Sequence, residues 1–364
     1  MDRPGLLSEV LAVLVEIDCH VLSAQAWTHN SRAACITTLV DLSTGQPITN
    51  RERLAHVQEQ VESVVGAHRV PGERMHVSLC GPTPGRVHSE RRLHQLMMED
   101  GDYESSPLPL PVEGDQFAAV NIEERKRHSS GLGLSMARTV TQVSVDSWKG
   151  RGYSVVNVRS RDRPKLLFDT VCALTDLQYA VFHAAVSSHG PVALQEYYIR
   201  HVDGCTLDAE TERRRVTRCL VAAIERRDSH GLRLDVCTRD RVGLLSEITR
   251  ALRENGLSLT KVECELQLDV MVGTFYVADA SGGTAVDVGM VEVLREKIGA
   301  DVALEIKSSP IQAQSFTTNN PASASPSQGA PSSGGVEGRK PRPSFGSLLW
   351  SHIERLSNFG SNGS

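Results

Sequence analysis

The sequence predicts an α+β protein built from tandem ferredoxin-like domains, each a β-α-β-β-α-β unit with an antiparallel sheet. Two observations predict this fold. The phrase Asp-Arg-x-x-Leu-Leu occurs three times, beginning at Asp2, Asp162 and Asp240, and each time it opens an apolar run with helical spacing. The second and third phrases lie 78 residues apart and the first two 160 apart, about twice that period. Such a period suits a small globular domain repeated in tandem rather than a solenoid.

Composition excludes several classes of protein. A chain of 364 residues can bury the cores of two or three small domains. The net charge of −5 gives no long-range attraction to nucleic acid or anionic lipid, and aromatic residues make up only 4%. None of the eight cysteines forms a C-x-x-C pair, and no signal peptide or apolar stretch of about 18 residues is present. We therefore expect a soluble intracellular protein of the cytoplasm or nucleus, without a transmembrane segment.

The last copy, residues 231–308, shows the complete order of elements. Leu232 to Cys237 alternates as a half-buried strand, and the turn at Asp240 follows it. A helix then runs to Asn255-Gly256, a pair that tolerates a left-handed C-cap. The pattern then predicts two strands, a helix and a final strand, over residues 257–268, 270–278, 287–298 and 302–306.

The middle copy, residues 140–230, repeats the start of this order. Strands are predicted over residues 153–158, 181–187 and 192–200, and helices over residues 164–177 and 208–226. The next strand, at Leu232, belongs to the last copy, so the middle copy lacks a sixth element of its own. An alternating run at residues 140–147 precedes its first strand. We hypothesise that a hairpin through residues 149–152 lays this run at the sheet edge as a substitute strand.

The first copy, residues 1–82, begins on its turn and lacks the strand that should precede it. Helices are predicted over residues 6–17 and 50–65, and strands over residues 21–28, 33–42 and 75–79. In this topology the first strand is central, so its absence leaves neighbouring backbone groups unpaired. Each buried group costs on the order of 1–3 kcal/mol. Either another strand fills the gap or the chain is a truncated form, and truncation is the expectation that we favour.

Two segments carry no copy of the turn phrase. Residues 83–139 are interpreted as a mostly flexible linker containing a short amphipathic helix at Ser89 to Glu99. Residues 309–364 form a low-complexity tail with a short apolar terminal segment from Leu348 to Phe359. That segment either docks on a membrane or partner or is a frayed terminal helix, and we prefer the second interpretation.

Several longer motifs accompany the repeat. They are Trp27-Thr28-His29-Asn30, Arg91-Arg92-Leu93-His94-Gln95, Asp102-Tyr103-Glu104, the run from Arg163 to Val171, Gln195 to His201, and Thr274 to Gly282. With these motifs, residues 1–308 resemble the ACT-domain repeat proteins of plants, the ACR family, whose members usually carry four ACT domains. The tandem domains also resemble the C-terminal end of bacterial PII-uridylyltransferases. This chain departs by lacking the first domain and the opening strand of the second. The resemblance implies a regulatory fold that binds small ligands, usually amino acids.

The turn phrase has the chemistry to bind such a ligand. The first N–H groups of a helix lack intrahelical partners and suit a carboxylate, and a glycine lets the ligand approach closely. Each Asp could pair with a ligand ammonium, or could serve only as an N-terminal cap. The third copy is favoured because it keeps its glycine in a complete domain, whereas Lys165 replaces glycine in the middle copy and the first copy lacks its opening strand. The predicted ligand-binding residues are Asp240, Arg241, Val242, Gly243 and Leu244; Asp2, Arg3, Pro4, Gly5 and Leu6; and Asp162, Arg163 and Lys165.

No catalytic, metal or cofactor site is predicted, because no paired carboxylates, nucleophile elbow or metal-ligand cluster emerges. The basic runs Arg213-Arg214-Arg215 and Arg226-Arg227 are interpreted as the solvated face of one helix. The leading functional hypothesis is a non-catalytic sensor of amino acids or nitrogen status, with glutamine as the first ligand to test. ACT domains would pack with one another or as a homodimer. The alternative is a protein-association scaffold without a ligand. RNA binding is disfavoured because the two candidate third strands lack the aromatic motif of RNA-recognition domains.

Overall fold

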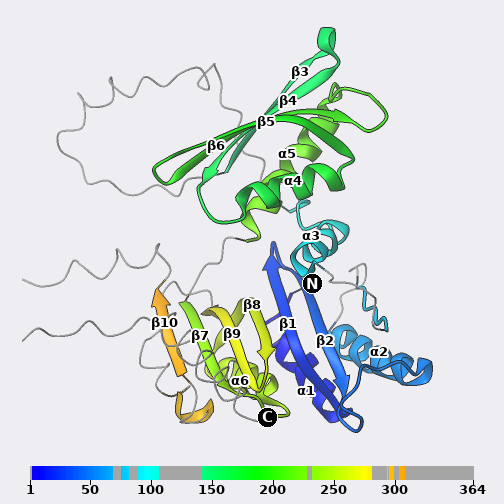
Figure 1. The fold of residues 1–364 in the computed structure, drawn as a ribbon, viewed down its shortest axis with the longest axis vertical. Helices are drawn as coiled ribbons and strands as arrows, with labels where there is room; N and C mark the ends of the chain where they lie inside the picture. The colour runs from blue at the N-terminus through cyan, green and yellow to red at the C-terminus, as the bar shows by residue number, and fades with distance from the viewer. Residues whose placement is uncertain are drawn as a thin grey trace, which may run out of the picture.

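The computed structural model describes residues 2–68, 75–81, 88–105, 141–227, 232–280, 293, 295–298 and 303–308. These residues form an α+β structure with two antiparallel sheets, which confirms the predicted fold class (Figure 1). Most of the predicted helix at residues 287–298 and the whole tail at residues 309–364 lie outside the described residues.

The elements follow the predicted order, with ends shifted by a few residues. Those of the first copy are α1 (Leu6–Glu16), β1 (Cys19–His29), β2 (Arg32–Asp41) and α2 (Arg51–Gly66). A separate helix follows, α3 (Ser89–Glu99). The middle copy contains β3 (Gln142–Trp148), β4 (Tyr153–Arg161), α4 (Leu166–Asp176), β5 (Tyr179–His189), β6 (Val192–His201) and α5 (Glu210–Glu225). The last copy contains β7 (Leu232–Arg239), α6 (Leu244–Glu254), β8 (Leu257–Gln267), β9 (Val270–Asp279) and β10 (Ala303–Ser308).

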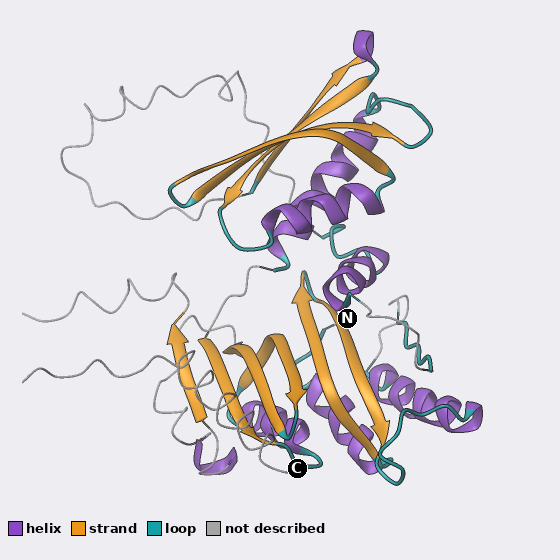
Figure 2. Ribbon diagram, viewed as in Figure 1, coloured by secondary structure: helices purple, strands orange, loops and turns teal. Residues whose placement is uncertain are grey.

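The first and last copies share one six-stranded sheet. Its order is β10-β7-β9-β8-β1-β2, so the last copy contributes four strands and the first copy two (Figure 2). The two copies join where β1 lies antiparallel to β8, from Ser23 opposite Glu265 to Trp27 opposite Lys261. Helices α1 and α6 pack side by side below this junction. One hydrophobic core therefore runs through both copies, from Leu11 and Leu14 of α1 to Ile248 of α6.

The middle copy forms its own four-stranded sheet in the order β3-β4-β6-β5. β3 lies antiparallel to β4 at the sheet edge, with Val145 opposite Val156. This is the edge at which the sequence analysis placed the substitute strand. Helices α4 and α5 pack together, and their apolar residues Leu174, Leu220 and Ile224 are fully buried in a second core.

The predicted strand at residues 75–79 is wrong. Residues 75–81 carry no strand, although Val77 and Leu79 still pack against the core of the shared sheet. In a ferredoxin-like unit this strand pairs with the unit's first strand. The described part of the first copy has no such strand, so the strand expected between β2 and residues 75–79 is missing.

The predicted helix at Ser89 to Glu99 is α3, and it connects the first and middle copies. The rest of the predicted linker, residues 83–87 and 106–139, lies outside the described residues. Leu93 and Met97 of α3 pack on Trp27 and Ala34 of the first sheet, and all four side chains are buried. The other side of α3 contacts α4. Residues 88–105 are thus a structural part of the junction between the two copies.

Ion pairs around α3 also correct the interpretation of Arg226 and Arg227 as a solvated face. Their exposed fractions are 5% and 8%. Arg226 donates to Asp102 at 3.0 Å, and Arg227 donates to Asp169 at 2.7 Å. Charged residues at a helix end usually face solvent. Here Arg226 and Arg227 follow α5 at the point where α3 covers its end, so they are buried and require charged partners.

His94 of α3 is the neutral member of this cluster. Its Nε2 lies 2.8 Å from Asp169, while its Nδ1 accepts from Arg226 at 3.2 Å, which leaves the proton on Nε2. Burial, opposed by Asp169 but supported by Arg226, lowers the pKa of His94. Burial alone would raise the pKa of Asp169, but hydrogen bonds from His94 and Arg227 lower it to about 2. The Asp169 carboxylate therefore stays charged among its donors.

Candidate functional site at the junction of the first and last copies

The turn between β7 and α6 has the geometry expected of a ligand-binding helix start. Gly243 adopts a left-handed conformation with φ of 80°, and its carbonyl accepts from Glu247, which closes the first helical turn at 2.9 Å. The amide of Asp240 is held by the Asp269 carbonyl at 2.8 Å. The amides of Leu245 and Ser246 belong to the first turn, whose N–H groups lack intrahelical partners and carry partial positive charge.

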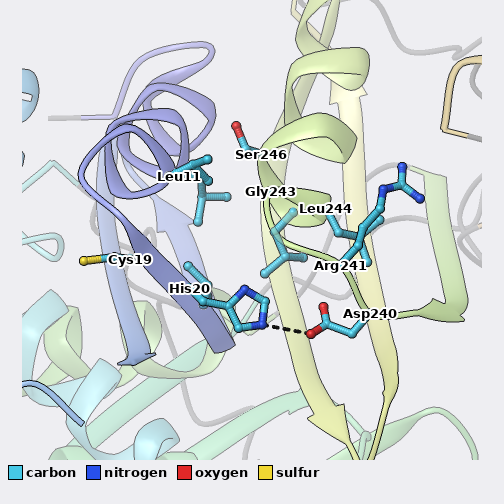
Figure 3. A pocket seen from close by; sticks show the side chains of 11 residues that line it. Leu11, Cys19, His20, Asp240, Arg241, Gly243, Leu244 and Ser246 are labelled. Atoms are coloured by element: carbon cyan, nitrogen blue, oxygen red, sulfur yellow. Dashed lines mark hydrogen bonds and ion pairs between the residues drawn. The ribbon is translucent and has the colours of Figure 1, made fainter. Parts of the chain in front are cut away.

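A cleft opens at this turn, between the first and last copies. It encloses about 260 Å³, including space open to solvent. Leu11, Val15, Cys19, His20 and Val21 line it from α1 and β1, and Asp240, Arg241 and Gly243 to Ser246 line it from the last copy (Figure 3). Most of that volume is open to solvent, so the site is a shallow cleft whose enclosed part has room for about one water molecule.

Asp240 is the polar centre of the cleft. One of its carboxylate oxygens, Oδ2, lies 2.8 Å from Nε2 of His20 (Figure 3). The other, Oδ1, is buried and has no hydrogen-bond partner. The side chain is 12% exposed, so the cost of removing Oδ1 from water is not recovered by any contact seen here. An ammonium group placed in the cleft would supply the missing donor.

The arginine of the turn phrase has the same structural role in all three copies, and Arg241 holds this position in the last copy. Its guanidinium pairs with Glu247 and donates to the Ile298 carbonyl at 3.3 Å. Arg3 makes the same pair of contacts with Glu9 and the Val64 carbonyl, and Arg163 makes them with Asp169 and the Ile224 carbonyl. In each copy the arginine ties the turn to its own helix and to the end of the second helix, so its side chain is not free for a ligand.

The turn of the first copy is covered by a side chain of the last copy. Gly5 is left-handed with φ of 85°, as Gly243 is. The Arg253 side chain lies over it, with Cδ only 2.5 Å from where a β-carbon of residue 5 would stand. Above Gly243 the corresponding atoms belong to Val15 and are 3.8 Å away. Residues 15 and 253 hold equivalent positions, 238 residues apart, as do Asp2 and Asp240. Two equivalent sites therefore differ because one faces valine and the other arginine.

The aspartate of the turn phrase also differs in its surroundings between the first and last copies. Burial raises the pKa of Asp2 to about 6, whereas Asp240 has His20 beside it. The remaining predicted residues of this copy, Pro4 and Leu6, are exposed and half-buried. In the last copy, Leu244 is buried in the core beneath the cleft, and Val242 is 45% exposed outside it.

The turn of the middle copy carries Lys165 where the other two copies have glycine, and this side chain reaches α3. Lys165 adopts the left-handed conformation with φ of 63°, which a side chain rarely takes. Its ammonium pairs with Glu90 of α3. Asp162, which is exposed, has its amide bound to the Pro191 carbonyl at 2.8 Å. Of the three turns, the one at Gly243 has neither an arginine side chain over it nor a side chain in place of the glycine.

His20 and Val15 were missed by the sequence analysis. Both come from the first copy, more than 200 positions from Asp240 in the chain, so no local pattern connects them to the turn. The repeat offset could have found Val15, because it aligns residue 15 with residue 253. His20 has no such signal, since Ser258 stands at its equivalent position.

No cluster of His, Cys, Asp or Glu side chains suited to a metal ion occurs among the described residues. None of the helices in the described part of the chain is long and apolar enough to cross a membrane.

Comparison with known proteins identifies the relatives. No protein-family model matches the chain. The ACT domain-containing protein ACR4 of Arabidopsis thaliana is 44% identical over 327 residues, covering 90% of this chain and 66% of that protein. ACR1 of the same plant is 42% identical over 362 residues, covering 98% of this chain and 70% of ACR1. The chain thus spans about two thirds of the length of these relatives.

More distant matches also exist. A bifunctional uridylyltransferase/uridylyl-removing enzyme of Rhodospirillum rubrum is 24% identical over 223 residues, which make up 19% of that enzyme. A solved structure described as a putative glycine cleavage system transcriptional repressor is 12% identical, covers 43% of this chain and 96% of its own, and has a TM-score of 0.21. On the strength of the Arabidopsis relatives, the chain belongs to the family of ACT domain-containing ACR proteins.

Proposed function

We propose that this chain is a non-catalytic regulatory protein that binds a free amino acid in the cleft at Asp240 and Gly243. The observation that carries the proposal is the buried Oδ1 of Asp240, which has no hydrogen-bond partner beside an open helix start. A buried carboxylate oxygen of this kind favours a cationic donor.

The two ends of an amino acid match the two ends of the cleft. Its ammonium would donate to Asp240, and its carboxylate would accept from the first-turn amides of Leu245 and Ser246. Gly243 leaves the backbone accessible at the point where a side chain would block the approach.

The position of the cleft supports a regulatory role. Because both copies line it, a ligand would bind the paired arrangement of β1 and β8 better than a separated one. A ligand shifts such an equilibrium only in proportion to its differential affinity for the two states. The bound amino acid would therefore stabilise the junction, and that change would be the signal passed to a partner.

Titration calorimetry on the full chain tests this proposal, with glutamine first and then the other amino acids. We expect one binding site. Asp240→Asn should weaken binding at least tenfold, because a hydrogen bond to a charged group contributes about 1.5–3 kcal/mol. Asp2→Asn, at the equivalent but covered position, is the matched control and should leave the affinity unchanged. Absence of heat with every amino acid, or equal losses in both variants, would count against the proposal.

Association without a ligand is the second candidate function. Two of the three turns contact the chain's own side chains, which suits a scaffold: Arg253 lies over Gly5, and Lys165 pairs with Glu90. Gly243→Asp separates the two functions, because it fills the cleft at a left-handed position. If this variant loses an amino-acid response that the wild type shows, the chain is a sensor. If the wild type itself shows no response, the scaffold is favoured.

A further inference from the structure

The open face of the four-stranded sheet carries a group of aromatic side chains. Helices α4 and α5 cover the other face, where Val156 and Tyr197 are fully buried (Figure 2). Because successive side chains of a strand point to opposite faces, Tyr153 and Tyr198 lie on the open face. Trp148 of β3 lies opposite Tyr153 in the register, so it shares this face.

The rings contact one another across the sheet. The ring centroid of Tyr153 is 6.1 Å from that of Trp148 and 5.6 Å from that of Phe182. Tyr198 is also 5.6 Å from Tyr153, and His183 lies 5.1 Å from Tyr198. Trp148 is 48% exposed and Phe182 is 56% exposed, so the contacts do not remove these rings from water. We call these five residues, which come from all four strands, the aromatic cluster.

The other two copies have no such cluster at the equivalent positions. Thr38 of the first copy and Tyr276 of the last copy correspond to Tyr198. The ammonium of Lys261 lies over the Tyr276 ring, 5.2 Å from its centroid. A leucine and a threonine stand at the position of Phe182. The fold itself therefore does not require these rings, and their exposure in the middle copy indicates a surface that binds something.

Two guanidinium groups lie beside the aromatic cluster, at the end of the sheet near Gly152. Arg151 lies over the Trp148 ring, 5.1 Å from its centroid, and Arg200 donates to the Gly152 carbonyl at 2.7 Å. Within the described part of the chain, neither guanidinium pairs with a carboxylate. Guanidinium groups bind phosphate through charge-assisted hydrogen bonds, so both can bind an anion.

The middle copy is also the basic part of the chain. In residues 141–227, Lys and Arg outnumber Asp and Glu by 13 to 10, whereas residues 2–68 have 4 against 8 and residues 232–280 have 6 against 8. The net charge of −5 therefore coexists with a local excess of positive charge. The open face does carry two carboxylates, Asp146 and Glu196. Phosphate groups are thus expected at the Gly152 end, beside the two arginines.

We propose that the aromatic cluster, with Arg151 and Arg200, binds single-stranded nucleic acid. Exposed ring faces stack with bases of any sequence, and the guanidinium groups would bind backbone phosphates. A row of side chains across four strands spans about 14 Å, given about 4.8 Å between strands, which is enough to stack two or three bases. The two guanidinium groups favour a polyanion over an apolar peptide, because such a peptide would use only the rings.

An aromatic motif within one strand, the usual sequence signal of RNA-recognition domains, is not needed for this site. Its rings come from four strands and are spread over residues 148–198. The site also lies apart from the amino-acid cleft, which is lined by α1, β1 and the turn before α6. Nucleic-acid binding can therefore fail while amino-acid binding is intact, and the reverse.

Fluorescence anisotropy of short labelled oligonucleotides, titrated with the full chain at low salt, tests the proposal. The wild type should bind a single strand at least tenfold more tightly than a duplex of the same sequence, because paired bases cannot stack on the rings. A single-stranded RNA and the corresponding DNA distinguish the two sources of the ligand.

Two tyrosines at equivalent positions give a matched pair of variants. Leucine keeps an apolar side chain and removes the ring, so Tyr198→Leu should weaken binding of the single strand at least tenfold. Tyr276→Leu, in the last copy, should leave the affinity unchanged. Circular dichroism confirms that each variant is folded. Trp148→Leu, at an exposed position, provides the same test if Tyr198→Leu does not fold.

Arg151→Gln tests the contact with phosphate. Loss of one phosphate contact should reduce the slope of log affinity against log salt by about 0.7. Arg239→Gln, at an exposed arginine of β7, is the control and should not change the slope. A wild type that binds no single strand at low salt would overturn the proposal. So would a duplex that binds as tightly as the single strand, or a Tyr198→Leu variant that folds and binds as the wild type does.

Discussion

The junction of the first and last copies is mainly apolar, whereas the junction of the first and middle copies contains a cluster of buried charges. The first and last copies join through hydrogen-bonded strands and an apolar pair of helices, and this junction leaves one buried carboxylate oxygen of Asp240 without a partner. The first and middle copies join through α3, where the Asp169 carboxylate receives His94, Arg163 and Arg227. The buried carboxylate of Asp169 thus has several donors, whereas Oδ1 of Asp240 remains available to one.

This difference predicts that removing the Asp169 carboxylate lowers stability, whereas removing the Asp240 carboxylate mainly weakens ligand binding. Breaking a buried cluster by deleting one member leaves its partners without compensation, which is more costly than the net contribution of the cluster. At Asp240 a deletion removes an already unsatisfied oxygen, so it should affect ligand binding more than stability.

Asp169→Ala should have the largest effect. The variant leaves two guanidinium groups and His94 buried without their carboxylate, at an expected cost of about 3–5 kcal/mol in the free energy of unfolding. Urea unfolding measures it. Glu210→Ala breaks an exposed pair with Arg214 on α5 and should cost no more than about 0.5 kcal/mol. Equal losses in the two variants would show that the cluster at α3 is not a structural centre.

Low pH should weaken the junction at α3. The pKa of Asp169 is about 2 in the folded protein against 3.8 for the free side chain. Its carboxylate therefore contributes stability above pH 3.8, and the contribution disappears as the pH falls through about 2. The shift corresponds to about 2 kcal/mol. Unfolding free energies at pH 5 and pH 2 should differ less for Asp169→Asn than for the wild type. An unchanged difference would contradict this assignment.

Exchanging residues 15 and 253 should exchange the open and covered sites. Val15→Arg would place over Gly243 the side chain that Arg253 places over Gly5, with Glu247 available as Glu9 is for Arg253. Amino-acid binding should weaken at least tenfold. Arg253→Val should uncover the Gly5 turn and raise the number of bound ligands from one to two, with lower affinity at the new site. Calorimetric stoichiometry decides, and a stoichiometry of one in Arg253→Val would show that Arg253 is not the obstruction.

The sequence predicted the repeated units well because their signals are local. The turn phrase places each helix start, and the helix at Ser89–Glu99 begins and ends at the predicted residues. The strand at residues 75–79 failed because a strand also depends on a neighbour, and alternation within five residues does not report whether that neighbour exists.

The contacts between copies could not be predicted from one sequence. Arg226 and Arg227 had the pattern of a solvated face, and their partners Asp102, Asp169 and His94 lie 58 to 132 residues away. The motifs around Trp27, His94 and Asp102 lie in separate stretches of the sequence, yet the structure places them together around α3. Asp240 and Gly243 were predicted, but His20 and Val15 complete the cleft from another copy.

Gln25 of β1 lies opposite Glu263 of β8, and the two hold equivalent positions 238 residues apart, so these strands pair about a near two-fold axis. This axis has a consequence for how mutations can act on the two copies. In a dimer of identical chains every substitution occurs on both sides of the axis. Here both sides belong to one polypeptide, so each can be mutated independently, and Val15 and Arg253 have diverged at one equivalent position. A single chain can thus keep one half of a symmetric pair open and the other half covered by an arginine, without negative cooperativity between them. Its saturation curve at that pair would be a simple hyperbola.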